Sequence, residues 1–197
     1  MSKEKSARKG TDGAQESEKL QKKLRLADSD VKGYQSLLIR LALLALVIWA
    51  LFFFAVGVMR VPNTDMSPRL DAGDMVLFYR LDKDVRAQDV IAIQKATPES
   101  KGEKTIFVLR VVAAPGDTVD IRDGRLFVNG NPQIETNIFF ETSAYGGFTE
   151  YPLTLGEGQC FVLADRRSDG TDSRFFGAVE KDEILGTVIA MMRRNKL

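Results

Sequence analysis

Residues 119–128 read VDIRDGRLFV, a stretch typical of a β-hairpin. Two short runs that contain alternating apolar side chains flank the pair Asp123-Gly124, which favours the two-residue turn between antiparallel strands. A second turn pair, Asn129-Gly130, follows directly. This part of the chain is therefore predicted to form antiparallel β structure.

Apolar runs on both sides of this hairpin are short and end at turn residues, which favours strands over helices. They are residues 75–79, 90–93, 105–113, 118–121, 126–128, 160–164 and 184–191. Residues 61–197 show no long helical period and are numerous enough for one core. We predict an all-β domain there, with bulges and long loops. Its aromatic and glycine-rich segment, residues 137–151, is expected to be a surface excursion near lipid or a partly buried loop.

A long apolar run precedes this domain. Residues 41–59 read LALLALVIWALFFFAVGVM and carry no charge. As a helix they extend about 28 Å, enough to cross the core of a bilayer. The run has no polar face at a period of 3.6 residues, which argues against a buried helix of a soluble protein. We predict a single transmembrane helix over residues 37–60, in contact with the lipid bilayer.

Charge asymmetry predicts the orientation of this helix. Residues 21–40 contain five Lys or Arg, whereas residues 60–79 contain two. The positive-inside rule places residues 1–36 in the cytoplasm, as a disordered charged tail, and residues 61–197 outside the plasma membrane. A cleaved signal peptide is the alternative, since Ala55-Val56-Gly57 is a small-x-small triplet, but its charged region and apolar run are both too long.

Composition excludes several classes of chemistry. The chain contains no His and one Cys, so it can build neither a Ser-His-Asp triad nor a four-thiolate zinc site. A net charge of +1 gives no general attraction to nucleic acid. We predict no metal, no cofactor and no nucleic-acid partner. Cys160 is expected to be a small buried apolar residue.

Three strings stand in register behind the predicted membrane helix. Residues 63–74 read NTDMSPRLDAGD, residues 109–117 read LRVVAAPGD, and residues 164–177 read ADRRSDGTDSRFFG. Their order, their spacing and their distance from the helix resemble the type I signal peptidase family, of the single-span Gram-positive kind. The resemblance covers about residues 40–191 and implies the coiled β domain of that family on one N-terminal transmembrane helix.

The resemblance also assigns the positions of the chemistry. In the family, the first string carries a serine nucleophile, the second a lysine base, and the third a serine that supports the lysine. This sequence has Asp65, Leu109 and Gly170 at those positions. The resemblance further assigns Asn63 and Met66 to the groove and oxyanion region.

Residues typical of turns and ion pairs remain where the reactive residues are lost. By resemblance we expect Arg110 to pair with Asp165 and Asp172 to pair with Arg174, as structural ion pairs. Random decay of a useless gene should damage both sets of residues. The pattern therefore indicates a retained fold from which the reaction has been removed.

Three hypotheses for function follow. The favoured one is a non-catalytic, membrane-anchored protein that binds or positions an exported protein. The family includes degenerate members associated with surface-pilus assembly, so the resemblance makes a pilin one candidate partner. The second is an active signal peptidase that cleaves leader peptides at small-x-small sites, using Asp65 with Asp165 or Asp172, or using Ser67 or Lys104. The third is an inert anchor.

Overall fold

The computed structural model describes residues 33–136, 138–145 and 148–193. The chain divides into two units, residues 1–52 and residues 53–197. Most of the helix Gly33–Ala55, which has 23 residues, belongs to the first unit. It is long and apolar enough to cross a membrane, so the predicted apolar anchor is confirmed. The predicted tail lies outside the described residues as far as residue 32.

The helix Gly33–Ala55 differs from the predicted span, residues 37–60, at both ends. It begins inside the predicted tail, and it stops before the apolar run does. Residues Val56–Arg60 instead form strand β1, which pairs with β2 (Met75–Tyr79). Hydropathy marks an apolar run but not its backbone conformation, and the valines of this segment suit a strand equally well.

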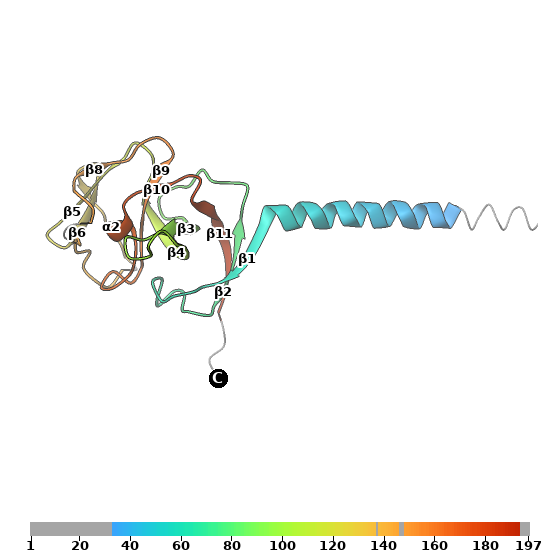
Figure 1. Ribbon diagram of the computed structural model, residues 1–197, viewed down its shortest axis with the longest axis horizontal. Helices are drawn as coiled ribbons and strands as arrows, with labels where there is room; N and C mark the ends of the chain where they lie inside the picture. Colours follow the sequence, from blue (N-terminus) through green and yellow to red (C-terminus); the bar gives the residue numbers. More distant parts are fainter. Residues whose placement is uncertain (1–32, 137, 146–147, 194–197) are drawn as a thin grey trace, which may run out of the picture. The chain divides into compact units, whose positions relative to one another are not determined.

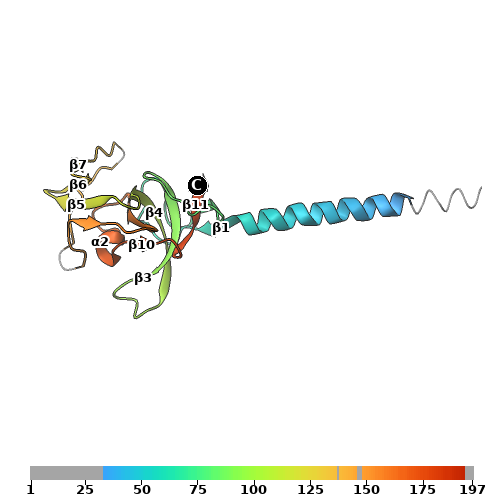
Figure 2. The same ribbon diagram turned by 90° about the horizontal axis from the view of Figure 1, so that it is seen from above.

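The strands of residues 53–197 form two antiparallel sheets (Figure 1). One sheet has the order β1-β2-β11-β3-β4-β9-β10, and the other has the order β7-β6-β5-β8. The smaller sheet lies at the end of this unit opposite β1 and β11 (Figure 2). The remaining bounds are β3 Val90–Ala96, β4 Lys104–Ala113, β5 Thr118–Arg122, β6 Arg125–Val128, β7 Asn131–Pro132, β8 Leu153–Thr154, β9 Gln159–Leu163, β10 Val179–Glu180 and β11 Ile184–Met192.

The predicted hairpin is confirmed in type and register. Strands β5 and β6 pair with Arg122 opposite Arg125, which leaves Asp123 and Gly124 as the two turn residues. Both have a positive φ, 50° and 70°, as the two-residue turn requires. The predicted all-β class is also confirmed, because the one described helix outside the anchor is the four-residue α2 (Ser173–Phe176).

Strand β4 carries core residues on both of its faces. Leu109 packs in a buried cluster with β3 and β9, among residues such as Ile91 and Val162. The preceding residue, Val108, packs in a different buried cluster with Met66. The alternation of a strand thus separates the second string into two environments, one on each face of the sheet.

The aromatic segment, residues 137–151, is partly exposed and partly packed; its residues 137, 146 and 147 lie outside the described part. Phe139 is 75% exposed. Phe148 stacks on Phe175 of α2, with ring centroids 4.1 Å apart, and Tyr145 contacts the same ring edge-on at 5.7 Å. The segment is therefore a surface excursion at one end and a cover for α2 at the other.

Candidate functional site

The first string folds into a compact turn that begins where β1 ends. Val61 donates to the Asp74 carbonyl at 2.8 Å and accepts from the Gly73 N–H at 2.9 Å, which closes the loop at its base. Gly73 has a φ of +92°, so this closure favours glycine there. Met66 and Leu70 are fully buried and anchor the loop from inside. A closed, anchored loop fixes the position of the residue at its tip.

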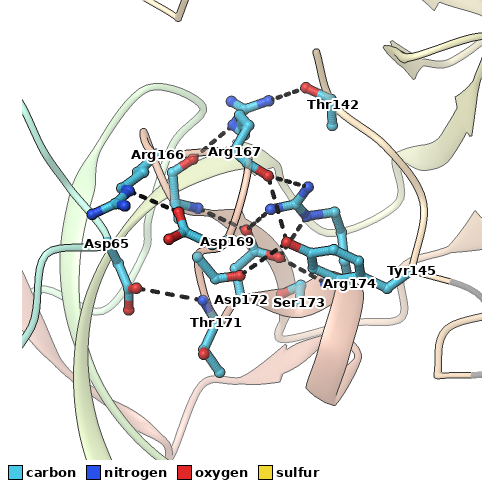
Figure 3. A network of polar contacts seen from close by, with 12 residues as sticks. Asp65, Thr142, Tyr145, Arg166, Arg167, Asp169, Thr171, Asp172, Ser173 and Arg174 are labelled. Carbon is cyan, nitrogen blue, oxygen red and sulfur yellow. Dashed lines mark hydrogen bonds and ion pairs between the residues drawn. The ribbon is translucent and has the colours of Figure 1, made fainter. Parts of the chain in front are cut away.

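That residue is Asp65, which is 8% exposed. Asn63 donates from its Nδ2 to Asp65 Oδ2 at 2.6 Å, and the Thr171 N–H donates to Oδ1 at 3.4 Å. Neither of these donors, the hydrogen-bond partners of the Asp65 carboxylate among the described residues, is an amine or a hydroxyl. The Arg166 N–H donates to the Asp65 carbonyl at 2.8 Å, so the first and third strings are joined through their backbones. Figure 3 shows Asp65 facing the third string through Thr171.

Burial raises the pKa of Asp65 from 3.8 to about 6. The Thr171 N–H acts in the opposite direction, while the charges of Asp172 and Asp169 raise the pKa further and Arg166 lowers it. At pH 7 the carboxylate is still mostly ionised, as the sequence predicts. It is, however, a buried negative charge whose proton is held more tightly than that of an ordinary aspartate.

Leu109, at the position of the family base, is fully buried in an apolar cluster. It pairs with Ile91 of β3, whereas Lys104, five residues earlier on β4, pairs with Ala96. Five residues along a strand span about 17 Å, and the odd offset turns the two side chains to opposite faces. Lys104 is exposed and therefore does not replace a base at position 109.

Beneath the site, the third string is held by buried ion pairs. Arg110 donates from Nε and Nη2 to the two carboxylate oxygens of Asp165, at 2.7 and 2.6 Å. Arg174 donates in the same two-pronged way to Asp172, at 2.9 and 2.8 Å, and both side chains are fully buried. Asp172 also caps α2. The structure thus brings together the residues that the resemblance pairs.

A third buried arginine was not expected from the sequence. Arg167 is 1% exposed and donates to the Ala164 carbonyl at 2.7 Å. It also binds both carboxylate oxygens of Glu135 and the Thr142 hydroxyl. This contact ties the third string to the aromatic segment (Figure 3). A sequence signal existed, since Arg167 lies inside the third string, but nothing in the sequence pointed to its partner 32 residues away.

The buried contacts of Arg110, Arg167 and Arg174 form a framework that holds the third string. Gly170, at the position of the supporting serine, belongs to the same string. Its N–H donates to the Arg166 carbonyl at 3.1 Å, and its next neighbour is Thr171, which contacts Asp65. Ala164 contributes to the same buried cluster as Leu109. Thr171 thus joins the third string to Asp65, and each of the three positions that carry the family chemistry is occupied by a residue that cannot fill the family role.

Comparison with known proteins identifies the same family as the three strings. The family model described as signal peptidase, peptidase S26, matches residues 34–192. The chain belongs to this family. The predicted type I signal peptidase resemblance is therefore confirmed.

The relatives of this signal peptidase family member include proteins named as peptidases and one named as inactive. The chain is 34% identical over 135 residues to thylakoidal processing peptidase 1 of Arabidopsis thaliana, covering 64% of this chain but 38% of that protein. It is 27% identical over 135 residues to "Inactive signal peptidase IA" of Staphylococcus aureus, covering 65% of this chain and 74% of that protein. The structure of a signal peptidase I from Enterococcus faecalis has 27% identity and a TM-score of 0.40, covering 53% of this chain and 97% of that one.

Proposed function

We propose that this protein is a non-catalytic, membrane-anchored member of the signal peptidase family that binds a segment of an exported protein and positions it. The observation that carries this proposal is the pair of residues at the reactive positions, Asp65 and the fully buried Leu109. A hydrocarbon side chain cannot accept a proton from a nucleophile. Loss of a general base alone reduces a rate by about 10²–10⁴-fold.

An active peptidase that uses two carboxylates is the competing function. Such a mechanism needs two carboxyl groups that share one proton. Asp165 and Asp172 are instead each bound through both carboxylate oxygens by a buried arginine, so their oxygens are already occupied. This arrangement argues against either residue sharing a proton with Asp65.

Strand β4 offers a backbone edge for an extended peptide. It pairs with β3 from Lys104 to Arg110, but β9 pairs with it only from Arg110 onward. Val111 exchanges hydrogen bonds with the β3 side, so alternation directs the backbone groups of Ile106 and Val108 toward the other edge. None of the strands in the described ranges pairs with that edge between residues 104 and 109. Peptide binding by strand addition uses such main-chain groups and needs no nucleophile.

The open edge lies beside the loop that carries Asp65, because Val108 packs in the same buried cluster as Met66 and Val61. Asp65 places a negative charge where the family brings the carbonyl of the scissile bond. This charge disfavours a carbonyl oxygen and favours a donor, such as an amide or the ammonium group of a lysine. The groove is therefore altered in its preference, and a segment with a lysine or amide at this position is the expected ligand.

The proposal also includes the orientation of the protein in the membrane and the kind of protein that it binds. The excess of Lys and Arg before the apolar helix supports a cytoplasmic N-terminus and an extracytoplasmic β domain. A pilin or another surface protein is the candidate for the bound segment. Positioning such a protein at the membrane suits a single-pass anchor with a peptide-binding edge.

The first experiment tests the absence of catalysis. The full-length protein in detergent micelles is incubated with a precursor that carries a small-x-small cleavage site, beside an active type I signal peptidase as the positive control. We expect leader removal at the rate of buffer alone. Leader removal well above that rate, abolished by Asp65→Ala, would show an active peptidase and end the proposal.

A second experiment tests binding. A photo-crosslinking residue is introduced in cells at Asn63, and a matched one at the exposed Glu99 in the loop between β3 and β4. We expect an adduct with one segment of an exported protein from position 63 and none from position 99. No adduct, or equal adducts from both positions, would favour the inert anchor.

Peptide binding to the purified protein tests the preference for a donor. Two peptides are compared that differ only by Lys or Met at the position nearest Asp65. We expect about tenfold tighter binding of the lysine peptide, corresponding to about 1.4 kcal/mol. Asp65→Asn should remove this preference while leaving the binding of the Met peptide unchanged. Equal affinities for the wild-type protein would contradict the altered groove.

A further inference from the structure

Gly170 lies against Ala164 with no space for a side chain. A Cβ at position 170 would sit 2.3 Å from the Ala164 Cβ and 2.8 Å from the Arg166 carbonyl oxygen. Real Cβ atoms do not approach other atoms so closely. Gly170 does not have a positive φ, so its backbone would accept any residue. It is the neighbours, and Ala164 above all, that restrict the position to glycine.

The backbone of Ala164 is held on both sides and cannot move aside. Its N–H donates to Asp172 Oδ2 at 3.0 Å, and its carbonyl accepts from Arg167 Nε at 2.7 Å. Both partners are buried, and each is bound to another charged residue, Arg174 or Glu135. A shift of Ala164 would therefore strain two buried ion pairs together.

Gly170 is held as well. Its N–H donates to the Arg166 carbonyl at 3.1 Å, while the Arg166 N–H donates to the Asp65 carbonyl at 2.8 Å. Displacing Gly170 away from Ala164 would disturb the contact between the first and third strings. Overpacking at such a site is costly, because close-packed surroundings relax only in part.

Ala164 also shares its buried surroundings with the position of the missing base. It belongs to the buried apolar cluster that contains Leu109. By the resemblance, a hydroxyl at position 170 would support an amine at position 109. A methyl group at Ala164 that excludes a side chain from position 170 therefore also excludes that hydroxyl.

We propose that Ala164 is the positioning residue that holds this site in its non-catalytic form. Its methyl group occupies the volume that any side chain at position 170 requires. The inference rests on the proposed function and deepens it: restoring the family residues at positions 65, 109 and 170 does not rebuild the site while Ala164 remains. Replacing Ala164 by glycine removes the closest contact, at 2.3 Å, and leaves the approach to the Arg166 carbonyl oxygen at 2.8 Å.

A double-mutant cycle tests this inference without reference to activity. Gly170→Ser is made in the wild-type protein and in an Ala164→Gly background, in full-length protein in micelles. Cys160, the single cysteine, is buried, so its reaction with a fluorogenic maleimide reports unfolding. We expect Gly170→Ser to lower the unfolding midpoint by about 5 °C or more in the wild-type background, and by less than about half as much after Ala164→Gly, where the contact with the Arg166 carbonyl remains.

Equal losses in the two backgrounds, or no loss in either, would overturn the role of Ala164. If Gly170→Ser alone fails to fold, recovery of folded protein by Ala164→Gly supports the inference, and failure of both variants overturns it. Gly156→Ser is the matched control, since a Cβ there meets only the flexible end of Gln159. This control should leave the midpoint nearly unchanged.

Activity provides the second readout. The triple variant Asp65→Ser/Leu109→Lys/Gly170→Ser is compared with and without Ala164→Gly on a small-x-small precursor. We expect leader removal at least about 100-fold faster with Ala164→Gly, the scale of one lost catalytic group. Equal rates would overturn the inference. Cleavage by the wild-type protein would instead refute the proposed function, and the stability cycle would still decide the role of Ala164.

Discussion

Two neighbouring regions of this protein differ in what they retain. One is the framework of buried ion pairs in the third string, and the other is the reaction centre of Asp65 and Leu109. The framework keeps buried, two-pronged ion pairs such as Arg174–Asp172. The reaction centre instead has Asp65 and Leu109 at the positions that carry a serine and a lysine in the family. The difference teaches that the fold is supported by groups that take no part in the chemistry. The stability of this fold therefore does not require the reactive residues of the family.

The largest expected effect comes from breaking the framework. Arg174→Ala leaves Asp172 as a buried charge without its partner, which costs about 3–5 kcal/mol of the free energy of unfolding. Thermal unfolding of the full-length protein, followed through Cys160, measures the loss. The control is Arg122→Ala: the Arg122 side chain is 56% exposed, and its pair with Asp120 at 3.5 Å should contribute under about 1 kcal/mol. Similar losses for the two variants would mean that the buried pairs do not support the fold.

The next effect comes from returning an amine to the reaction centre. Leu109→Lys buries an ammonium group in an apolar cluster, which lowers the lysine pKa and costs about 3–4 kcal/mol at pH 7. Because the folded protein then binds fewer protons than the unfolded chain, stability should recover as the pH rises toward 10. Leu109→Met is the control and should cost under about 1.5 kcal/mol, without pH dependence.

Unfolding measured from pH 6 to pH 10 checks the Leu109→Lys prediction. A variant as stable as the wild type at pH 7 would mean that the site still provides a partner for an amine. In that case the reaction centre would be closer to catalysis than its residues indicate, and the contrast with the framework would weaken.

Much of the fold could be predicted from the sequence because strands leave a local signal. Turn pairs such as Asp123-Gly124 sit between alternating apolar residues, and the structure places β5 and β6 there. Strand β1 was missed for a physical reason. Its residues continue the apolar run of the membrane helix, and hydropathy cannot tell the end of a helix from the first strand after it.

The site could be predicted only in part. The resemblance carried by the three strings assigned Asp65 and Leu109 to the reactive positions, and each string is a local pattern in the sequence. The hydrogen bond from the Arg166 N–H to the Asp65 carbonyl joins residues 101 apart (166 minus 65), and no pattern along the chain reports it. The contact between Ala164 and Gly170 was hidden for another reason: both residues are small and carry no chemical signal of their own.

The smallest effect tests the buried charge of Asp65. Burial raises its pKa from 3.8 to about 6, so the folded protein holds this proton more tightly than the unfolded chain does. The contribution to stability is complete below about pH 4 and is lost as the pH rises through 6. Asp65→Asn should remove this loss and stabilise the protein at pH 7 by about 1–2 kcal/mol, after a discount for solvent screening.

Unfolding by denaturant between pH 4 and pH 7, followed by circular dichroism, measures the Asp65 contribution. Asp84→Asn is the matched control: Asp84 is exposed and beside Lys181, which lowers its pKa, so this variant should keep the decline between pH 4 and 6. If Asp65→Asn also keeps it, the carboxylate is not a destabilising charge. The preference for a donor at this position would then lose its physical basis, because an aspartate that is already satisfied has little to gain from an incoming lysine.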